Sequence, residues 1–226
     1  MEHSNHIIYI EASADLCSVC IAEGESIKVI RESKINKSHS ELMAPLIDDC
    51  LRELNLRASD LAAVCIAEGP GSYTSLRITA ATAKGLCFGA SIPLITVGTL
   101  EGLAYGADIS DTDLIIPTVD AGRNEVYYQV FDKNRNALSL VSPHILEAHS
   151  FSKHPDDKIL ICGNGALKAE KIIVNPKVRF LQTEFSCQNL IKPGLKKFID
   201  QDFTEIFYFS PLYLKSPNIT SPRSKF

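Results

Sequence analysis

The strongest chemical signal in the sequence is a glycine-rich segment, Glu68-Gly69-Pro70-Gly71-Ser72, between an apolar run and a helical pattern. A turn of this kind points backbone N–H groups and the positive end of a helix dipole outward, which suits an anion such as phosphate. The segment lacks the Gly-Lys-Ser/Thr ending of a P-loop and the spacing of a dinucleotide site. Two interpretations stay open. Gly69, Gly71 and Ser72 bind a phosphate, or they form a tight turn in which Ser72 caps the helix.

Two acidic residues stand at the ends of apolar runs and could face each other across a cleft. Glu11 follows residues 7–10, with Ser13 two positions later, and Asp120 follows residues 114–119. A carboxylate pair could serve acid–base chemistry. A lone aspartate at a strand end is also a common turn residue, so we predict no catalytic role for Glu11 or Asp120.

The chain has seven cysteines, and Cys17 and Cys20 have the spacing of a redox or zinc-binding pair. Both fall in one strand-like run, where residues three apart point to opposite faces. The number of cysteines is odd, and several lie in apolar runs where a reduced thiol packs as a small hydrophobic group. We therefore expect free thiols and no disulfides.

The first half of the chain predicts one sheet with attached helices. Three short runs separated by polar breaks predict an antiparallel meander at residues 7–10, 16–22 and 27–32. A helical period follows, with Ser38 or Ser40 as the candidate N-cap and an apolar stripe of Leu42, Met43, Leu46, Ile47, Cys50, Leu51 and Leu54. Strands and helices then alternate, with strands predicted at residues 61–67 and 94–97 and helices at residues 72–89 and 100–105.

The second half repeats this order in a degenerate form. Three strands are predicted at residues 114–119, 125–131 and 137–140. Further strands are predicted at residues 159–162 and 178–181, with a helix after residue 165 and another at residues 187–200. Two lobes of one order predict an α/β protein of the ribonuclease-H-like, actin-like architecture. The lobes are expected at residues 1–105 and 106–226, with the nucleotide cleft of that architecture between them.

Composition indicates an ordinary globular protein. Of 226 residues, 45% are hydrophobic and 22% charged, and no apolar run approaches the roughly 20 residues that cross a bilayer. Because the polar start lacks the basic stretch of a signal peptide, we expect a cytoplasmic protein without a membrane contact. The net charge is −4 and the basic residues are scattered, so the sequence predicts no broad basic surface for a nucleic-acid backbone.

Several segments resemble the TsaB family, also called YeaZ. In the first lobe these are residues 67–78, 83–86 and 93–101. Residues 119–127 resemble the family's second-lobe strand and turn, and residues 211–215, Pro-Leu-Tyr-Leu-Lys, its C-terminal ending. The match covers the first lobe closely, whereas beyond about Phe131 only isolated pieces agree.

The resemblance implies a subunit without a catalytic site of its own. Its partner in the family is the catalytic paralogue TsaD, which transfers threonylcarbamoyl to the tRNA adenosine next to the anticodon, assisted by the ATPase subunit TsaE. The chain would then contact tRNA only through the complex. It would carry no cofactor alone, and ATP or ADP would bind only in the complex.

The resemblance also shows where catalytic features are missing. A metal-binding segment of TsaD is similar to residues 97–103, but its two histidines fall at Thr99 and Leu103, which cannot replace imidazoles. Actin-like kinases hold magnesium and phosphate with an acidic residue and a following hydroxyl, where this chain has Glu11 and Ala12. We therefore expect no metal and a vestigial nucleotide cleft, formed by Glu11, Ser13, Gly69, Gly71, Ser72 and Asp120.

The two helices predicted at residues 40–54 and 72–89 are the candidate partner interface. The first has an apolar stripe wider than one sheet-facing side requires, and the second is rich in small residues that allow another helix to approach closely. Packing on the lobe's own sheet must explain part of this pattern. The family resemblance implies that both helices bind TsaD, or a second copy of the chain when TsaD is absent. The interface residues predicted are Leu42, Met43, Leu46, Ile47, Arg77, Thr79, Ala80 and Ala83.

Two other function classes compete with a binding subunit. One is an active actin-like ATPase or kinase, and the other is a metallopeptidase-like enzyme. The missing ligands at Ala12, Thr99 and Leu103 weaken both. Micromolar magnesium-dependent ATP binding, or stoichiometric zinc or iron in the isolated chain, would favour them.

Overall fold

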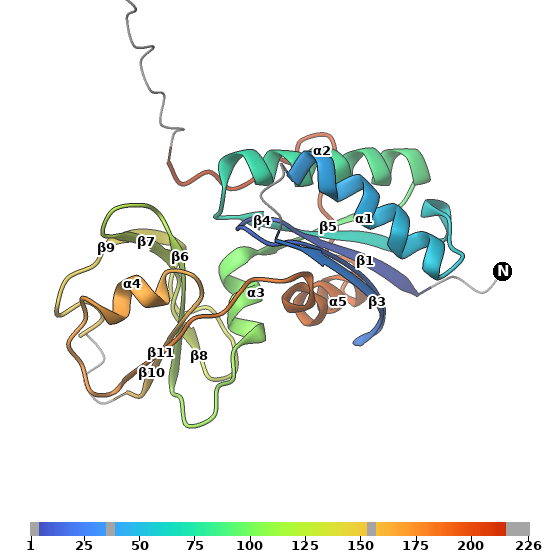
Figure 1. The fold of residues 1–226 in the computed structure, drawn as a ribbon. Helices are drawn as coiled ribbons and strands as arrows, with labels where there is room; N and C mark the ends of the chain where they lie inside the picture. Colours follow the sequence, from blue (N-terminus) through green and yellow to red (C-terminus); the bar gives the residue numbers. More distant parts are fainter. Residues whose placement is uncertain (1–4, 35–38, 153–156, 216–226) are drawn as a thin grey trace, which may run out of the picture.

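The computed structural model describes residues 5–34, 39–152 and 157–215 (Figure 1). The candidate N-cap Ser38 lies outside the described residues, and Ser40 lies within a helix instead of at its cap. Within these ranges, no helix has the length and apolar character needed to cross a membrane.

The first lobe is a five-stranded sheet with the strand order β3-β2-β1-β4-β5. Its strands are β1 (His6–Glu11), β2 (Cys17–Glu23), β3 (Ser26–Ser33), β4 (Ala63–Gly69) and β5 (Leu94–Gly98). Strands β1 to β3 are antiparallel, as predicted, whereas β4 and β5 run parallel to β1. The helices are α1 (His39–Glu53), the short 3-10 helix η1 (Ala58–Asp60), α2 (Tyr73–Ala90) and α3 (Thr99–Gly106).

The second lobe repeats this topology. Its sheet has the order β11-β10-β6-β7-β9, and the short strand β8 also pairs with β6. The strands are β6 (Leu114–Asp120), β7 (Glu125–Tyr128), β8 (Phe131–Asp132), β9 (Ser142–Ile145), β10 (Ile159–Cys162) and β11 (Val178–Leu181), with helix α4 (Ala166–Glu170) after β10. Strand β7 is antiparallel to both of its neighbours, β6 and β9, whereas β10 is parallel to both of its neighbours, β6 and β11. Since the first sheet has the same arrangement, the predicted pair of ribonuclease-H-like, actin-like lobes is confirmed.

One predicted strand is wrong. Residues 137–140 were assigned to the third strand of the second lobe, but β9 begins only at Ser142. Asp132 explains the displacement, because its side chain accepts hydrogen bonds from the N–H groups of Asn134 and Asn136 and folds the chain into a tight turn. Leu138 and Leu140 then lie exposed, so their apolar character did not indicate a buried strand.

Each face of the first sheet has its own core, because successive strand side chains point to opposite faces. Ile8 and Ile10 pack under α1 and α2, which Figure 1 shows on one side of the sheet. Tyr9 and Cys65 pack on the other side, against α3 and the C-terminal helix. Cys17 and Cys20 belong to these two different cores, and all seven cysteines are free and buried, as predicted.

The chain returns to the first lobe after the second sheet. The 3-10 helix η2 (Cys187–Leu190) and α5 (Ile191–Ile199) pack against the first sheet, where Gly194 lies against Cys65 and Tyr9. The first sheet ends with β5 at Gly98 and the second begins with β6 at Leu114, but the segment from Cys187 to Lys215 contributes its contacts mainly to the first lobe. Sequence order had placed this segment in the second.

Candidate functional site

Glu11 ends β1 beneath the loop that leads to β2. Its carboxylate accepts hydrogen bonds from the backbone N–H and the hydroxyl of Ser13, and its Oε2 atom has no partner among the described residues. The side chain is completely buried. Burial raises the pKa of Glu11 to about 8, against the opposite effect of the Ser13 hydrogen bonds. A carboxyl group that is largely protonated at neutral pH is a poor magnesium ligand.

The glycine-rich turn packs against this loop instead of facing a ligand. The Ser72 N–H donates to the carbonyl of Ser13 (2.8 Å). A Cβ atom at Gly71 would lie 2.6 Å from the Cβ of Ser13. Ser72 occupies the N-cap position of α2, but its side chain makes no capping hydrogen bond and instead accepts one from the Ser75 hydroxyl. The tight-turn interpretation agrees with the position of Ser72, although its side chain does not cap the helix, and the phosphate site stays a prediction.

Gly71 is required by its close approach to Ser13, whereas among the described glycines near this turn only Gly69 has a positive φ (+113°). We expect Gly71→Val to lower the free energy of unfolding, by about 1–3 kcal/mol, because the valine side chain would overlap Ser13. Urea unfolding followed by circular dichroism measures this loss. Gly85→Ala, in open space on a helix, is the control and should not lose stability. A Gly71→Val variant as stable as the parent would contradict the overlap.

A small cavity lies between the lobes, at the carboxyl ends of strands from both sheets. Its volume is about 100 Å³, below the several hundred Å³ of usual ligand pockets. The lining residues are Ser13, Ala14, Asp15, Leu16, Thr99, Leu103, Val119, Asn164, Gln182, Thr183, Glu184 and Phe185. Asp15 and Glu184 are acidic and no lining residue is basic, which disfavours a phosphate. Of the six residues predicted for the cleft, only Ser13 lines this cavity.

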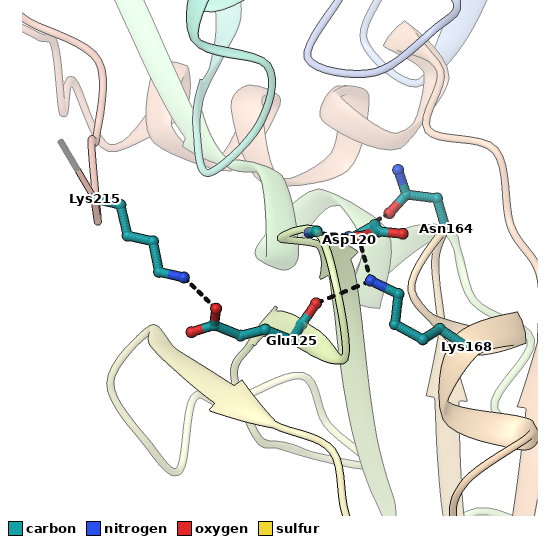
Figure 2. A network of polar contacts seen from close by, with 6 residues as sticks. Asp120, Glu125, Asn164, Lys168 and Lys215 are labelled. Atoms are coloured by element: carbon teal, nitrogen blue, oxygen red, sulfur yellow. Dashed lines mark hydrogen bonds and ion pairs between the residues drawn. The ribbon is translucent and has the colours of Figure 1, made fainter. Parts of the chain in front are cut away.

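Asp120 organises a turn instead of facing Glu11. Its carboxylate accepts from the Gly122 N–H and forms an ion pair with Lys168, while its own N–H donates to Asn164 Oδ1 (2.8 Å), as Figure 2 shows in part. Lys168 also donates to the carbonyl of Glu125. The turn interpretation of Asp120 is therefore the one that the contacts support.

Helix α3 carries the two positions where TsaD would have its metal-binding histidines. Thr99 and Leu103, four residues apart, are both buried at about 1% exposure. Thr99 Oγ1 has no hydrogen-bond partner among the described residues. Both side chains reach the cavity, so the helical spacing is retained while the imidazoles are absent.

The predicted interface residues divide into two groups. Met43, Ile47, Thr79, Ala80 and Ala83 are buried inside the first lobe. Since these five side chains face the lobe's own core, their prediction as partner contacts is wrong. Leu42 and Leu46 are half-buried, and Arg77 is exposed.

The outer side of α2 presents Arg77 together with exposed residues that were not predicted as interface residues. Ala81, Gly85 and Gly89 recur every four residues and are all exposed, with Arg77 and Phe88 beside them. These five residues all lie on α2. We call the outer sides of α1 and α2 together, including these residues, the α1–α2 face. The positions of Ala81, Gly85 and Gly89 around the helix axis, on the side away from the buried Ala80, Ala83 and Cys87, were the signal that could have identified them.

Comparisons with known proteins identify relatives of this chain. A family model described as tRNA N6-adenosine threonylcarbamoyltransferase matches residues 30–203. The chain is 34% identical over 137 residues, 60% of its length, to tRNA threonylcarbamoyladenosine biosynthesis protein TsaB of Buchnera aphidicola subsp. Acyrthosiphon pisum. It is 30% identical over 124 residues, 54% of its length, to the protein of the same name from Haemophilus influenzae. The matches span 61% and 52% of these relatives' own lengths.

A solved structure matches over nearly the whole chain. YeaZ from Pseudomonas aeruginosa aligns with a TM-score of 0.80 and 21% identity, covering 93% of this chain and 100% of that one. At this identity the likeness establishes the fold. It includes the second lobe, where the sequence resemblance was weak.

Proposed function

Because this chain belongs to the family named for tRNA N6-adenosine threonylcarbamoyltransferase, we propose that it is a non-catalytic, cytoplasmic subunit in tRNA threonylcarbamoyladenosine biosynthesis. It binds a TsaD-type paralogue and makes that enzyme competent to modify the adenosine next to the anticodon. TsaE acts on the same complex, through which tRNA and any ATP or ADP are bound. Without TsaD, the chain forms a homodimer through the same surface.

The observation that carries this proposal is Gly85 on the α1–α2 face. A glycine inside a helix costs about 0.5–1 kcal/mol relative to alanine. At Gly85 nothing lies within 4 Å of the place where a Cβ atom would be, so the lobe itself does not require a glycine there. Close approach of a helix from another subunit would require it, because small residues let helix axes come near each other.

The surroundings of Gly85 also fit a protein interface. Phe88 is 71% exposed, and the ring of Phe207 lies 6.4 Å away in an edge-on arrangement. Exposed aromatic and arginine side chains next to small residues are typical of the centre of an interface. Arg77 supplies the arginine on the same helix.

The inter-lobe chemistry supports a non-catalytic role. Glu11 is buried and Thr99 and Leu103 stand where imidazoles are needed. The cavity carries two acidic residues where a nucleotide would need cations. Among the described residues at this cavity, these side chains do not supply the metal or phosphate ligands that an ATPase or a metallopeptidase would need.

The test is reconstitution with the separate proteins. We expect the isolated chain to hydrolyse no ATP above background and to leave tRNA unmodified. Mixed with TsaD, TsaE and the threonylcarbamoyl adenylate, it should raise the threonylcarbamoyladenosine content of tRNA, measured by mass spectrometry of nucleosides. Omitting the chain is the control. Modification of tRNA by the chain alone would refute the proposal.

A further inference from the structure

The segment after α5 crosses the first lobe and contains a turn in which the Phe209 N–H donates to the carbonyl of Glu205. Thr204 donates its N–H to the carbonyl of Leu94 on β5 (2.8 Å), and its hydroxyl lies 2.9 Å from that of Thr96. Farther along, Phe209 packs on the core under α2, with the Lys84 ammonium 5.9 Å from its ring centre. The segment is therefore part of the lobe's packing.

The segment then sits on the turn before α2. The Leu212 N–H donates to the carbonyl of Glu68 (2.7 Å). A Cβ atom at Gly69 would lie 2.9 Å from the Leu212 carbonyl oxygen, so this approach needs a glycine. The ring of Tyr213 lies 4.7 Å from that of Tyr73, the first residue of α2. Residues 211–215 thus pack closely against the turn before α2 and against the first residue of that helix.

Lys215 next reaches the second lobe. It forms an ion pair with Glu125 on β7 and lies 5.9 Å from the ring centre of Tyr127. Figure 2 shows Glu125 held from two sides, by Lys215 at its carboxylate and by Lys168 at its backbone carbonyl. Lys168 is fixed in turn by Asp120.

A second connection between the lobes lies on the opposite side of the first sheet. There, Leu100 and Leu103 of α3 share one core with Ile115, Phe131 and other residues of the second sheet. Figure 1 shows α3 on the side away from α2. Two connections on opposite sides of the first sheet fix the angle between the lobes, because a rotation of the second lobe about one connection must break the other.

We propose that residues 211–215 form an inter-lobe latch, in which Lys215 holds the second lobe at a fixed angle to α2. The latch also reaches the α1–α2 face. Tyr73, on which Tyr213 stacks, accepts a hydrogen bond from the exposed Arg77 (3.1 Å). A partner that binds this face therefore depends on the latched position of Tyr73, and this part rests on the proposed function.

The latch is tested by electron–electron resonance distances between one spin label in each lobe. Ser26→Cys and Glu170→Cys are exposed label sites, and the native thiols are buried. We expect one narrow distance distribution in the parent. Lys215→Ala and Glu125→Ala should each broaden it, and both together should broaden it no further. Lys192→Ala, which removes another surface ion pair, is the matched control.

Two further measurements separate the ion pair from unfolding. The charge exchange Lys215→Glu with Glu125→Lys should restore the narrow distribution. In the parent, 1 M salt should broaden it, because the Debye length falls to about 3 Å. Unchanged thermal melting of Lys215→Ala would show that the lobes stay folded. A parent-like distribution in Lys215→Ala would overturn the latch.

A separate measurement tests whether the latch affects the binding of TsaD. We expect Lys215→Ala to weaken TsaD binding at least about fivefold in calorimetry, while Lys192→Ala does not. Parent-like affinity of a variant with broadened distances would overturn the connection and leave the latch. Failure of the parent itself to bind TsaD would refute the proposed function, while the distances in the isolated chain would still decide the latch.

Discussion

Ala81→Glu should abolish binding of the chain to TsaD while the chain stays folded. Ala81 is exposed in the middle of the α1–α2 face, so the free chain tolerates a carboxylate there. In the complex the charge would be desolvated and unpaired. A penalty of about 3 kcal/mol corresponds to a loss of affinity of more than a hundredfold. Calorimetry and analytical ultracentrifugation should show loss of both the TsaD complex and the homodimer.

Two matched variants make this result specific. Ala148→Glu places the same change on an exposed loop of the second lobe and should bind like the parent. Gly85→Ala should raise the free energy of unfolding by about 0.5–1 kcal/mol and still weaken binding, because the added methyl group holds the partner helix away. A substitution that increases the stability of the free chain and yet weakens its binding to the partner identifies a contact surface. If Ala81→Glu and Gly85→Ala both bound TsaD at parental affinity, the α1–α2 face would not be the interface.

The second large effect is the dependence of stability on pH, which we assign to Glu11. The pKa of Glu11 in the folded chain is raised to about 8, above its ordinary 4.5, by burial. The folded state therefore holds a proton that the unfolded state releases between these values. The resulting stabilisation is fully present below about pH 4.5 and is lost as the pH rises through about 8.

We expect the free energy of unfolding to fall by on the order of 4 kcal/mol from pH 5 to pH 8.5 through this group. Glu11→Gln is neutral at every pH and can still accept from Ser13, so it should remove most of this slope and be more stable than the parent at pH 8.5. Urea unfolding at several pH values measures both. Glu170→Gln, at an exposed position, is the control and should retain the parental slope. The same slope in Glu11→Gln would show that the carboxyl is not buried as described.

The sequence by itself determined the architecture, because the spacing of hydrophobic residues along the chain follows the local geometry of a strand or a helix. Residues 7–10, 16–22 and 27–32 predicted three strands that the structure contains with a shift of one residue at each end. The repeated order predicted a second lobe even where similarity to relatives was weak. It failed at residues 137–140, where exposed Leu138 and Leu140 imitate a strand. A turn formed by one side chain, that of Asp132, displaced the true strand along the chain.

The site residues depended on information that spacing alone does not contain. Gly71 and Ser72 have suitable types for a phosphate site and Glu11 for its magnesium, but the structure places all three in contact with Ser13 and buries the Glu11 carboxylate. Likewise, small residues on α2 predicted an interface without deciding which side of the helix faces the sheet.

Only the tertiary structure decided which side of α2 faces the sheet and which residues far apart in the sequence come into contact. Ala80 and Ala83 face the core while Ala81 and Gly85 face outward, because the sheet fixes the rotation of α2 about its axis. The sequence by itself marked residues 211–215 as a family ending. Their contact with Glu125, 90 positions earlier in the chain, follows from two lobes folding together, since ion pairs form between groups that packing has already brought close.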